Sequence, residues 1–303
     1  MRAVVVGAIA IAALLAGLIE ASRPSVRSNP KSHPATQITA AAAGTSLAEP
    51  PAELANSLNQ AQAVIDDPTS SPAELSDAGW FEQLSTLALE RERVQTRRAT
   101  LAALDGAAAA TMQADLSAAG ALAQLVSPRN SLPRWKIVQP PPPGTLLGYF
   151  KAAQARFGIP WQDLAAIEFI ETKFGRVAGL STAGAEGPMQ FLPSTWASYG
   201  SGNVHDQRAA ILGAARYLRA NGAPGDIPGA LHHYNPSIDY VRAVTDYASR
   251  MRGDPRAYFG YYVWQVTYAL KSGLVELPAG YPAVRPVPVS PSSLSVASSG
   301  TPP

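Results

Sequence analysis

A single carboxylate among apolar residues is the feature of this sequence best suited to chemistry. We expect a helix from Trp161 onward, in which successive side chains are rotated by ~100° around the axis. Five side chains then fall on one face of the helix, a stripe about 120° wide: Leu164, Ile167, Ile170, Glu171 and Phe174. Glu168 falls at the edge of that stripe. Removal from water raises the pKa of a carboxyl group, as a general acid at neutral pH requires. The stripe alone also fits a surface glutamate near the end of a helix, because amphipathic patterns have ragged edges.

A loop of small residues follows the glutamate, and polar side chains come after it. Four glycines interrupt the chain here: Gly175, Gly179, Gly184 and Gly187. Such a loop lets the backbone approach a ligand closely. The pairs Met189-Gln190 and Tyr234-Asn235 then supply amide and hydroxyl groups that could hold a sugar. Together with Glu171, these residues indicate a site that cuts a glycosidic bond.

Residues 171–196, ETKFGRVAGLSTAGAEGPMQFLPSTW, resemble the transglycosylase SLT family of lytic murein transglycosylases, a branch of the lysozyme superfamily. The matched positions are Glu171-Thr172, Phe174-Gly175, Ser181, Gly184-Ala185, Gly187, Met189-Gln190, Pro193 and Thr195. Downstream, Tyr234-Asn235 and Tyr240-Val241 match the Tyr-Asn motif of the family and its continuation. Because the matches are numerous and in order, chance is a poor explanation for them.

The resemblance covers most of the chain, from about Ala52 to Tyr281. It is greatest to secreted Gram-positive members, whose sequences share the segment Asp254–Tyr261. Two departures are Pro188, where many members have Leu, and the pair His232-His233 before the Tyr-Asn motif. They affect the expected contacts to the sugar more than the expected reaction.

The resemblance implies a reaction in which one residue acts first as acid and then as base. It favours Glu171 over Glu168, because the catalytic Glu of the family is followed by Ser or Thr. Glu171 would protonate the oxygen between N-acetylmuramic acid and N-acetylglucosamine in peptidoglycan glycan strands. It would then take the proton of the C6 hydroxyl as a 1,6-anhydro ring closes. By this resemblance the protein needs neither a second carboxylate nor a cofactor.

Four further residues are implied in substrate binding. The amides of Gln190 and Asn235 would contact the N-acetyl group and sugar hydroxyls, and Tyr234 would orient the N-acetyl group or Glu171. Ser181 would bond the sugar or Glu171. Met189 is expected to pack under the site rather than to touch the sugar.

Two other classes of function remain open on the sequence. Most glycosidases use two carboxylates, and Glu186 or Asp206 could serve as the second one in a muramidase of the lysozyme type. A protein that binds the cell wall without catalysis would keep the groove and need no acid. The presence of Glu171 argues against that second alternative.

Composition and charge exclude several other functions. The chain has 303 residues, of which 47% are hydrophobic and 15% charged, and its net charge of +2 is too small to indicate nucleic-acid binding. The absence of cysteine excludes a disulfide framework, a lipid-modified cysteine and a thiolate metal site. His232 and His233 are adjacent and point apart, and no pair of histidines has the HExxH spacing, so no metal is expected.

The two ends of the chain differ in composition from its middle. Residues 1–21, with Arg2 before the apolar run Ala3–Ile19, indicate a signal peptide or a membrane anchor, and hence export to the cell wall or the outer face of the membrane. Residues 22–48 are rich in Pro, Ser, Thr and Ala, as a disordered linker is. Residues 275–303 predict a disordered tail.

The elements between these ends read as helices, and we expect an all-α fold with a lysozyme-like catalytic domain. Residues 49–135 predict an N-terminal helical region, with a capping box at Ser71 and Glu74; it would be a layer packed on the catalytic domain or a partner-binding hairpin. Residues 136–274 predict the transglycosylase domain. No strand pattern is seen, and Ala257–Leu270 is expected to be a helix rich in aromatic core residues. Trp135 is expected to anchor the connector.

Overall fold

The computed structural model describes residues 49–289. The predicted signal peptide or anchor, the predicted linker and residues 290–303 of the predicted tail lie outside these described residues. Within them the chain is mainly helical, as expected. The helices are α1 (Pro51–Asp66), α2 (Pro72–Arg91), α3 (Val94–Ala103), α4 (Gly106–Ala123), α5 (Pro143–Phe157), α6 (Trp161–Thr172), α7 (Pro193–Tyr199), α8 (Gln207–Ala220), α9 (Ile227–Tyr234), α10 (Ile238–Gly253) and α11 (Ala257–Val263).

Local sequence signals begin several of these helices. At α2 the predicted capping box forms: the Ser71 backbone N–H donates to Glu74 Oε2 at 2.8 Å, and the Glu74 N–H donates to Ser71 Oγ at 3.3 Å. Pro72 takes the first helical position, where its missing N–H is not needed. Proline also begins α1, α5 and α7. Such starts depend only on neighbouring residues, which is why the sequence predicts the capping box of α2.

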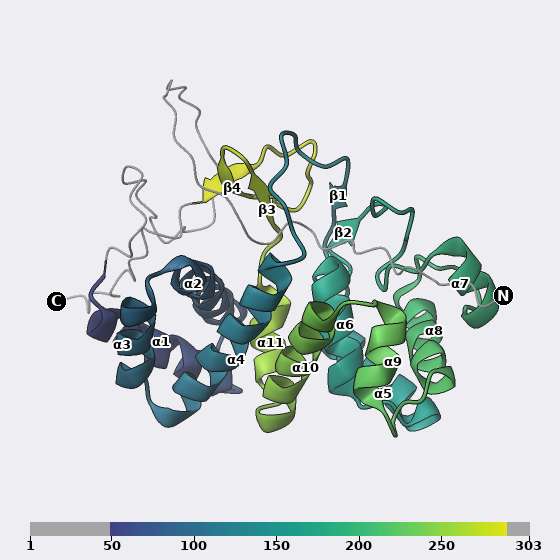
Figure 1. Ribbon diagram of the computed structural model, residues 1–303, viewed down its shortest axis with the longest axis horizontal. Helices are drawn as coiled ribbons and strands as arrows, with labels where there is room; N and C mark the ends of the chain where they lie inside the picture. The colour runs from purple at the N-terminus through teal and green to yellow at the C-terminus, as the bar shows by residue number, and fades with distance from the viewer. Residues whose placement is uncertain (1–48, 290–303) are drawn as a thin grey trace.

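The helices form two groups that share a central layer (Figure 1). Helices α1–α4 lie at one end and α5, α7, α8 and α9 at the other, with α6, α10 and α11 between them. Helix α10 packs against α4 on one side and α6 on the other. The buried apolar side chains form two cores. One lies between α1–α4 and the short strands, and the other surrounds α6. The N-terminal helices are therefore a layer packed on the central helices, although the predicted domain boundaries stay a prediction.

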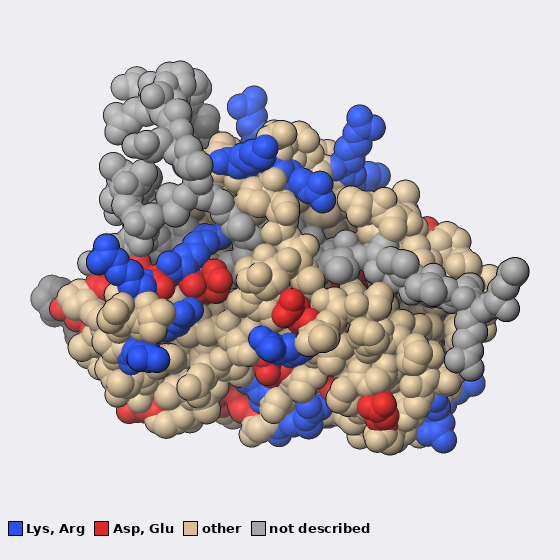
Figure 2. Space-filling view, in the orientation of Figure 1, with Lys and Arg blue, Asp and Glu red and all other residues tan. Residues whose placement is uncertain are grey.

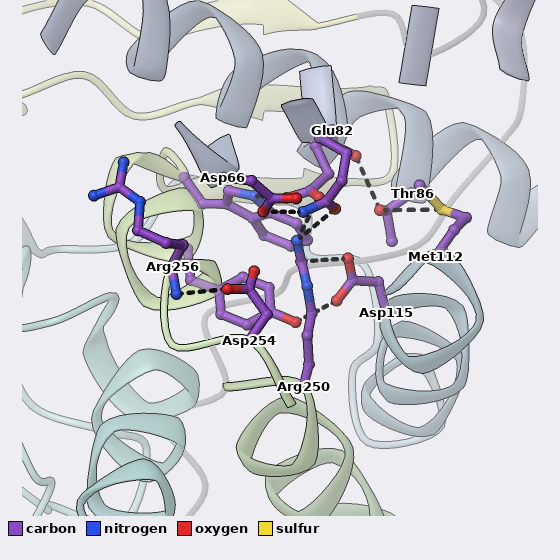
Figure 3. A network of polar contacts seen from close by, with 11 residues as sticks. Asp66, Glu82, Thr86, Met112, Asp115, Arg250, Asp254 and Arg256 are labelled. Carbon is purple, nitrogen blue, oxygen red and sulfur yellow. Dashed lines mark hydrogen bonds and ion pairs between the residues drawn. The ribbon is translucent and has the colours of Figure 1, made fainter. Parts of the chain in front are cut away.

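A buried network of charges joins the N-terminal helices to α10 (Figure 3). Arg250 of α10 donates to Asp115 of α4 at 2.9 Å and to Glu82 of α2 at 2.7 Å. It also donates to Gln62 of α1 at 3.3 Å, and Tyr261 donates to Asp115. All these side chains are buried. One cation thus holds two carboxylates from two other helices in a place that excludes water.

We expect Arg250→Met to lower the free energy of unfolding by about 3–5 kcal/mol, because it leaves two buried carboxylates without their cation. Burial already raises the pKa of Asp115 to about 7, and without the Arg250 cation, which opposes that rise, the pKa would go higher still. Stability is therefore lost as the pH rises, and the deficit should be larger near about pH 7 than near about pH 5. Urea unfolding of the variant and the unmutated protein at both pH values measures this difference in the free energy of unfolding. An equal deficit at the two pH values would contradict this account.

The expectation of a helix over Ala257–Leu270, and of no strands, is wrong. Helix α11 ends at Val263, and the chain continues into β3 (Thr267–Leu270). Gln83 of α2 holds the extended link: its side chain accepts from the Gln265 N–H at 2.7 Å and donates to the Gln265 carbonyl at 2.9 Å. Tyr258, Tyr261 and Trp264 are core residues, as expected. The extended link after this helix is thus held by a residue 182 positions away in the sequence.

Residues 275–289 are also ordered, contrary to the expected tail. Strands β4 (Gly273–Glu276) and β5 (Val287–Val289) extend β3 into an antiparallel sheet in the order β3-β4-β5. A separate two-stranded antiparallel sheet is formed by β1 (Lys136–Ile137) and β2 (Val177–Ala178). Each strand is too short for a periodic pattern to be visible in the sequence. Their pairing, which is set by the fold, makes them strands.

The segment before α5 connects the two sheets. Arg129 exchanges backbone hydrogen bonds with Ala269 and Lys271 at 3.1 and 2.9 Å. The Val138 N–H donates to the Arg176 carbonyl at 2.9 Å, directly after α6. Trp135 packs edge-on against Tyr268, with ring centres 5.5 Å apart, as an anchor would. We call residues 127–140 and 264–289 the β-rich end.

Candidate active site

Helix α6 places Glu171 in the centre of the molecule. Every residue of this helix except Gln162 is buried, because α5, α8, α10 and α11 surround it. The prediction of an amphipathic helix with one buried face is therefore wrong. Other helices cover α6 on all sides, as is usual for a mainly apolar helix in the centre of a protein. Lys173 and Phe174 at its end have positive φ angles of 53° and 60°, and Gly175 has 81°. This left-handed stretch ends the helix just after Glu171.

The carboxyl group of Glu171 has one protein partner and one free oxygen. Its side chain is only 3% exposed, and Oε1 accepts a hydrogen bond from the Tyr240 hydroxyl at 2.8 Å. Oε2 has no partner among the described residues. Burial raises the pKa of Glu171 to about 8, and the hydrogen bond from Tyr240 opposes that rise. The group is therefore protonated at neutral pH and able to give a proton.

Glu168 is more deeply buried than the sequence predicts. It lies at 0% exposure instead of at the edge of a stripe, and neither of its oxygens has a partner among the described residues. Burial raises its pKa well above the ordinary value, so it too is neutral. Burial therefore does not distinguish the two glutamates, whereas the hydrogen bond from Tyr240 does.

The loop after α6 is tied to the helix by Thr172. The Thr172 hydroxyl donates to the Pro188 carbonyl at 2.6 Å and accepts from the Gly175 N–H at 3.0 Å. Gly187 passes so close to the Val204 carbonyl that a Cβ would lie 2.2 Å from its oxygen. Thr172 and Gly187 hold the loop in one path beside the end of α6. Of the glycines noted in the sequence, Gly187 thus serves close packing against backbone, and Gly175 and Gly179 lie against the side chains of Gln207 and Trp135.

The structure places Ser181 within this loop as an acceptor of backbone hydrogen bonds. Its hydroxyl accepts from the N–H groups of Ala183 and Ala185, at 3.2 and 2.9 Å. The side chain is 8% exposed, and no hydrogen bond joins it to Glu171. Its own hydrogen remains available to donate. The contact to Glu171 that the resemblance implied for Ser181 is not present.

Gln190 is held rigidly with one free acceptor. Its φ angle of 49° is in the left-handed region, and its amide nitrogen donates to the carbonyls of Gly187 and Gly179 at 2.8 and 3.4 Å. Its Oε1 is buried and has no partner among the described residues. Met189 is fully buried, as expected of a packing residue. The free oxygen of Gln190 can therefore accept from an N–H or O–H of a ligand.

Tyr234 and Tyr240 lie parallel beside Glu171. Their ring planes differ by 6°, with centres 6.4 Å apart, and the Tyr234 hydroxyl donates to the Met189 carbonyl. Asn235 follows Tyr234, is 3% exposed, and its backbone N–H ends α9 by donating to Leu231 at 2.9 Å. This arrangement connects the Met-Gln pair, the Tyr-Asn pair and Glu171, three segments that lie far apart in the sequence.

Tyr240 is the site residue that sequence reasoning missed. It stands in the first turn of α10, whose N-cap Ser237 accepts from the Tyr240 N–H at 3.3 Å. The sequence showed it only as part of a motif. A fully buried tyrosine hydroxyl is expected to have a partner, but no local pattern could reveal that the partner is Glu171.

The two candidate second carboxylates have other partners. Glu186 pairs with His205, with 3.3 Å between Oε2 and Nε2. Asp206 caps α8 by accepting from the Ala209 N–H at 2.7 Å. Neither is among the groups that shift the pKa of Glu171. Glu171 thus holds a proton that it can give, and neither candidate second carboxylate acts on it.

Comparison with known proteins gives a partial match. The chain is similar to the membrane-bound lytic murein transglycosylase F of Thiobacillus denitrificans (strain ATCC 25259 / T1). The two are 31% identical over 118 residues, which is 36% of this chain and 25% of that protein. The chain thus spans about a quarter of the length of the relative it matches. No family model and no solved structure matches the chain.

The described residues contain neither a metal site nor a membrane span. No group of three or more His, Asp or Glu side chains within residues 49–289 is arranged to hold a metal ion. None of the helices in that range is both long and apolar enough to cross a bilayer.

Proposed function

We propose that this protein is a peptidoglycan lytic transglycosylase that cleaves the β-1,4 bond between N-acetylmuramic acid and N-acetylglucosamine. The observation that carries the proposal is the buried carboxyl of Glu171, which has a pKa raised to about 8, a hydrogen bond from Tyr240 to one oxygen and no partner on the other. The partial similarity to a protein named as a lytic murein transglycosylase supports the substrate class. So do the Met-Gln and Tyr-Asn pairs beside Glu171.

The two oxygens of Glu171 would have different tasks. Tyr240 donates its hydrogen to Oε1, so the acidic proton belongs on Oε2, which has no protein partner. Oε2 would give this proton to the glycosidic oxygen as the bond to the muramic acid carbon breaks. The substrate's own N-acetyl oxygen would stabilise the cation. Oε2, now a carboxylate oxygen, would take the proton of the C6 hydroxyl as that oxygen closes the 1,6-anhydro ring.

The remaining site residues would bind the sugar. The free Oε1 of Gln190 would accept from the N-acetyl N–H or from a hydroxyl. Asn235, whose side-chain amide makes no hydrogen bond within the described residues, would offer both a donor and an acceptor. Ser181 would donate its hydroxyl hydrogen to the sugar, and Tyr234 would orient the N-acetyl group.

The enzyme would act outside the cytoplasmic membrane, where its substrate is. The basic and apolar start of the sequence, Arg2 followed by Ala3–Ile19, supports export and a possible membrane tether. Resemblance to secreted Gram-positive members supports the same location. Finding the full-length chain in the cytoplasm would contradict it.

Mass analysis of the products from purified peptidoglycan tests the reaction. We expect muropeptides that end in 1,6-anhydro-N-acetylmuramic acid, each lighter by one water than the product of a hydrolase. Reducing ends alone would mean that water is the nucleophile, and Glu186 or Asp206 would be the next residue to test as its base. Binding without any cleavage would favour the wall-binding alternative.

A further inference from the structure

The charges of this protein are segregated between the β-rich end and the rest. The β-rich end has five basic residues, all exposed, and one acidic residue, Glu276, which is largely removed from solvent. The other described residues have 15 basic and 20 acidic side chains. Figure 2 shows basic side chains over the part of the molecule that carries β3 and β4, without acidic ones among them. The five are Arg129, Arg134, Lys136, Lys271 and Arg285.

This basic surface is joined to the active site through Trp135. Arg134 and Lys136 flank Trp135, whose ring lies against Gly179, so closely that a Cβ there would be 2.4 Å from it. Gly179 in turn accepts from the amide nitrogen of Gln190 at 3.4 Å. Two contacts therefore connect the cations to a residue of the sugar site. The pairing of β1 with β2 supports the same junction.

Exposed apolar side chains accompany the cations. Four of the large apolar residues exposed in the described chain lie at this end, with exposures from 39% to 50%: Leu132, Val138, Val284 and Val287. Cations interspersed with apolar groups suit a ligand that has carboxylates and small apolar side chains. Such a ligand occurs on the substrate itself, because the muramic acid of peptidoglycan carries short peptides with alanine side chains and free carboxylates.

We propose that the basic surface of the β-rich end binds the carboxylates of the peptide stems on the glycan strand held at Glu171. This inference rests on the proposed function and adds a preference for strands that carry stems over bare glycan. The junction at Trp135 favours stems over a separate anionic polymer of the wall, because the bound strand itself brings stems to this surface. The attraction would be electrostatic and weakened by salt.

Binding can be measured without cleavage by using the full-length Glu171→Gln protein. The ligands are glycan strands with their stems and the same strands after an amidase has removed the stems. We expect roughly tenfold tighter binding to strands with stems at about 0.05 M salt, and most of this difference lost at about 0.5 M. Adding Arg134→Gln, Lys136→Gln and Lys271→Gln should remove the difference. All three residues are exposed, so these changes should leave the fold intact.

A matched control removes three cations elsewhere: Arg93→Gln, Arg98→Gln and Lys151→Gln, all exposed residues of the helical part. It should keep the preference for stems. Equal binding to both strands, or equal loss in the control, would overturn the inference. A further measurement uses whole cell walls before and after their phosphodiester polymers are removed. If binding of the protein falls only on that removal, those polymers are the ligand and the inference is overturned. Failure of the proposed function itself would appear separately, as no 1,6-anhydro product from the unmutated protein.

Discussion

Glu171→Gln should lower activity on peptidoglycan at least ~10²-fold, because general acid catalysis contributes about 10²–10⁴-fold and the amide has no acidic proton to give. The side chain keeps its shape, and the Tyr240 hydroxyl can still donate to the amide oxygen. The protein should therefore remain folded. Release of soluble muropeptides, measured beside the unfolding midpoint, checks both points. Activity at the parental rate would show that Glu171 is not the acid.

Glu168→Gln is the matched control, three residues earlier on the same helix. We expect a mild effect on activity, because this carboxyl is fully buried and has no contact that the reaction needs. A loss as large as that of Glu171→Gln would mean that the assignment of the acid is wrong. The pair of variants separates the effect of a lost acid from the effect of an altered buried helix.

Both variants should also change how stability depends on pH. The folded protein holds the proton of Glu171 up to about pH 8, whereas an ordinary glutamate releases it near 4.5. The folded state therefore binds more protons than the unfolded chain between these values, and stability falls as the pH rises through them. Glutamine does not titrate, so each variant should lose part of this alkaline decline. Unfolding midpoints measured across that range test it.

Activity should fall as the pH rises above about 8, by nearly tenfold for each further pH unit, because only protonated Glu171 can act as the acid. Tyr240→Phe should move this decline to higher pH. The hydrogen bond from Tyr240 favours the carboxylate and lowers the pKa of Glu171, so its removal raises that pKa further. The same change should lower the rate at neutral pH, because Glu171 loses the partner that orients it.

The profile of kcat/KM against pH measures this effect, since it reports the free enzyme. Tyr247→Phe is a suitable control: this tyrosine is buried on the same helix but makes no hydrogen bond to Glu171. It should leave the alkaline decline in place. A decline that stays in place in Tyr240→Phe, or moves to lower pH, would contradict the role given to the hydroxyl.

Features that depend on neighbouring residues could be predicted from the sequence. The capping box of Ser71 and Glu74 needs only the first turn of α2. The end of α6 was not predicted: Phe174 was expected within the helix, whereas Lys173 and Phe174 take left-handed angles after Thr172. The helical class and the candidate Glu171 came from the same local patterns and from an ordered motif. Such features are local because the hydrogen bonds and backbone angles that define them involve residues three or four apart.

Features that depend on distant partners were decided by the tertiary structure. Residues 264–270 leave the helical path because Gln83 binds the backbone of Gln265 and β3 pairs with β4. The sequence could not show this, since each of these strands has at most four residues.

The division between Glu168 and Glu171 has the same origin. From the sequence, Glu171 was expected inside an apolar stripe and Glu168 at its edge, and the family resemblance favoured Glu171; packing on all sides of α6 buries both. The two glutamates differ in their hydrogen bonds: the hydroxyl of Tyr240 on α10, 69 residues away in the sequence, donates to Glu171. The sequence alone determined that a carboxyl group would sit among apolar residues near a glycine-rich loop. Only the packing of α10 against α6 decided which carboxyl meets a donor, because that depends on where another helix places its side chains.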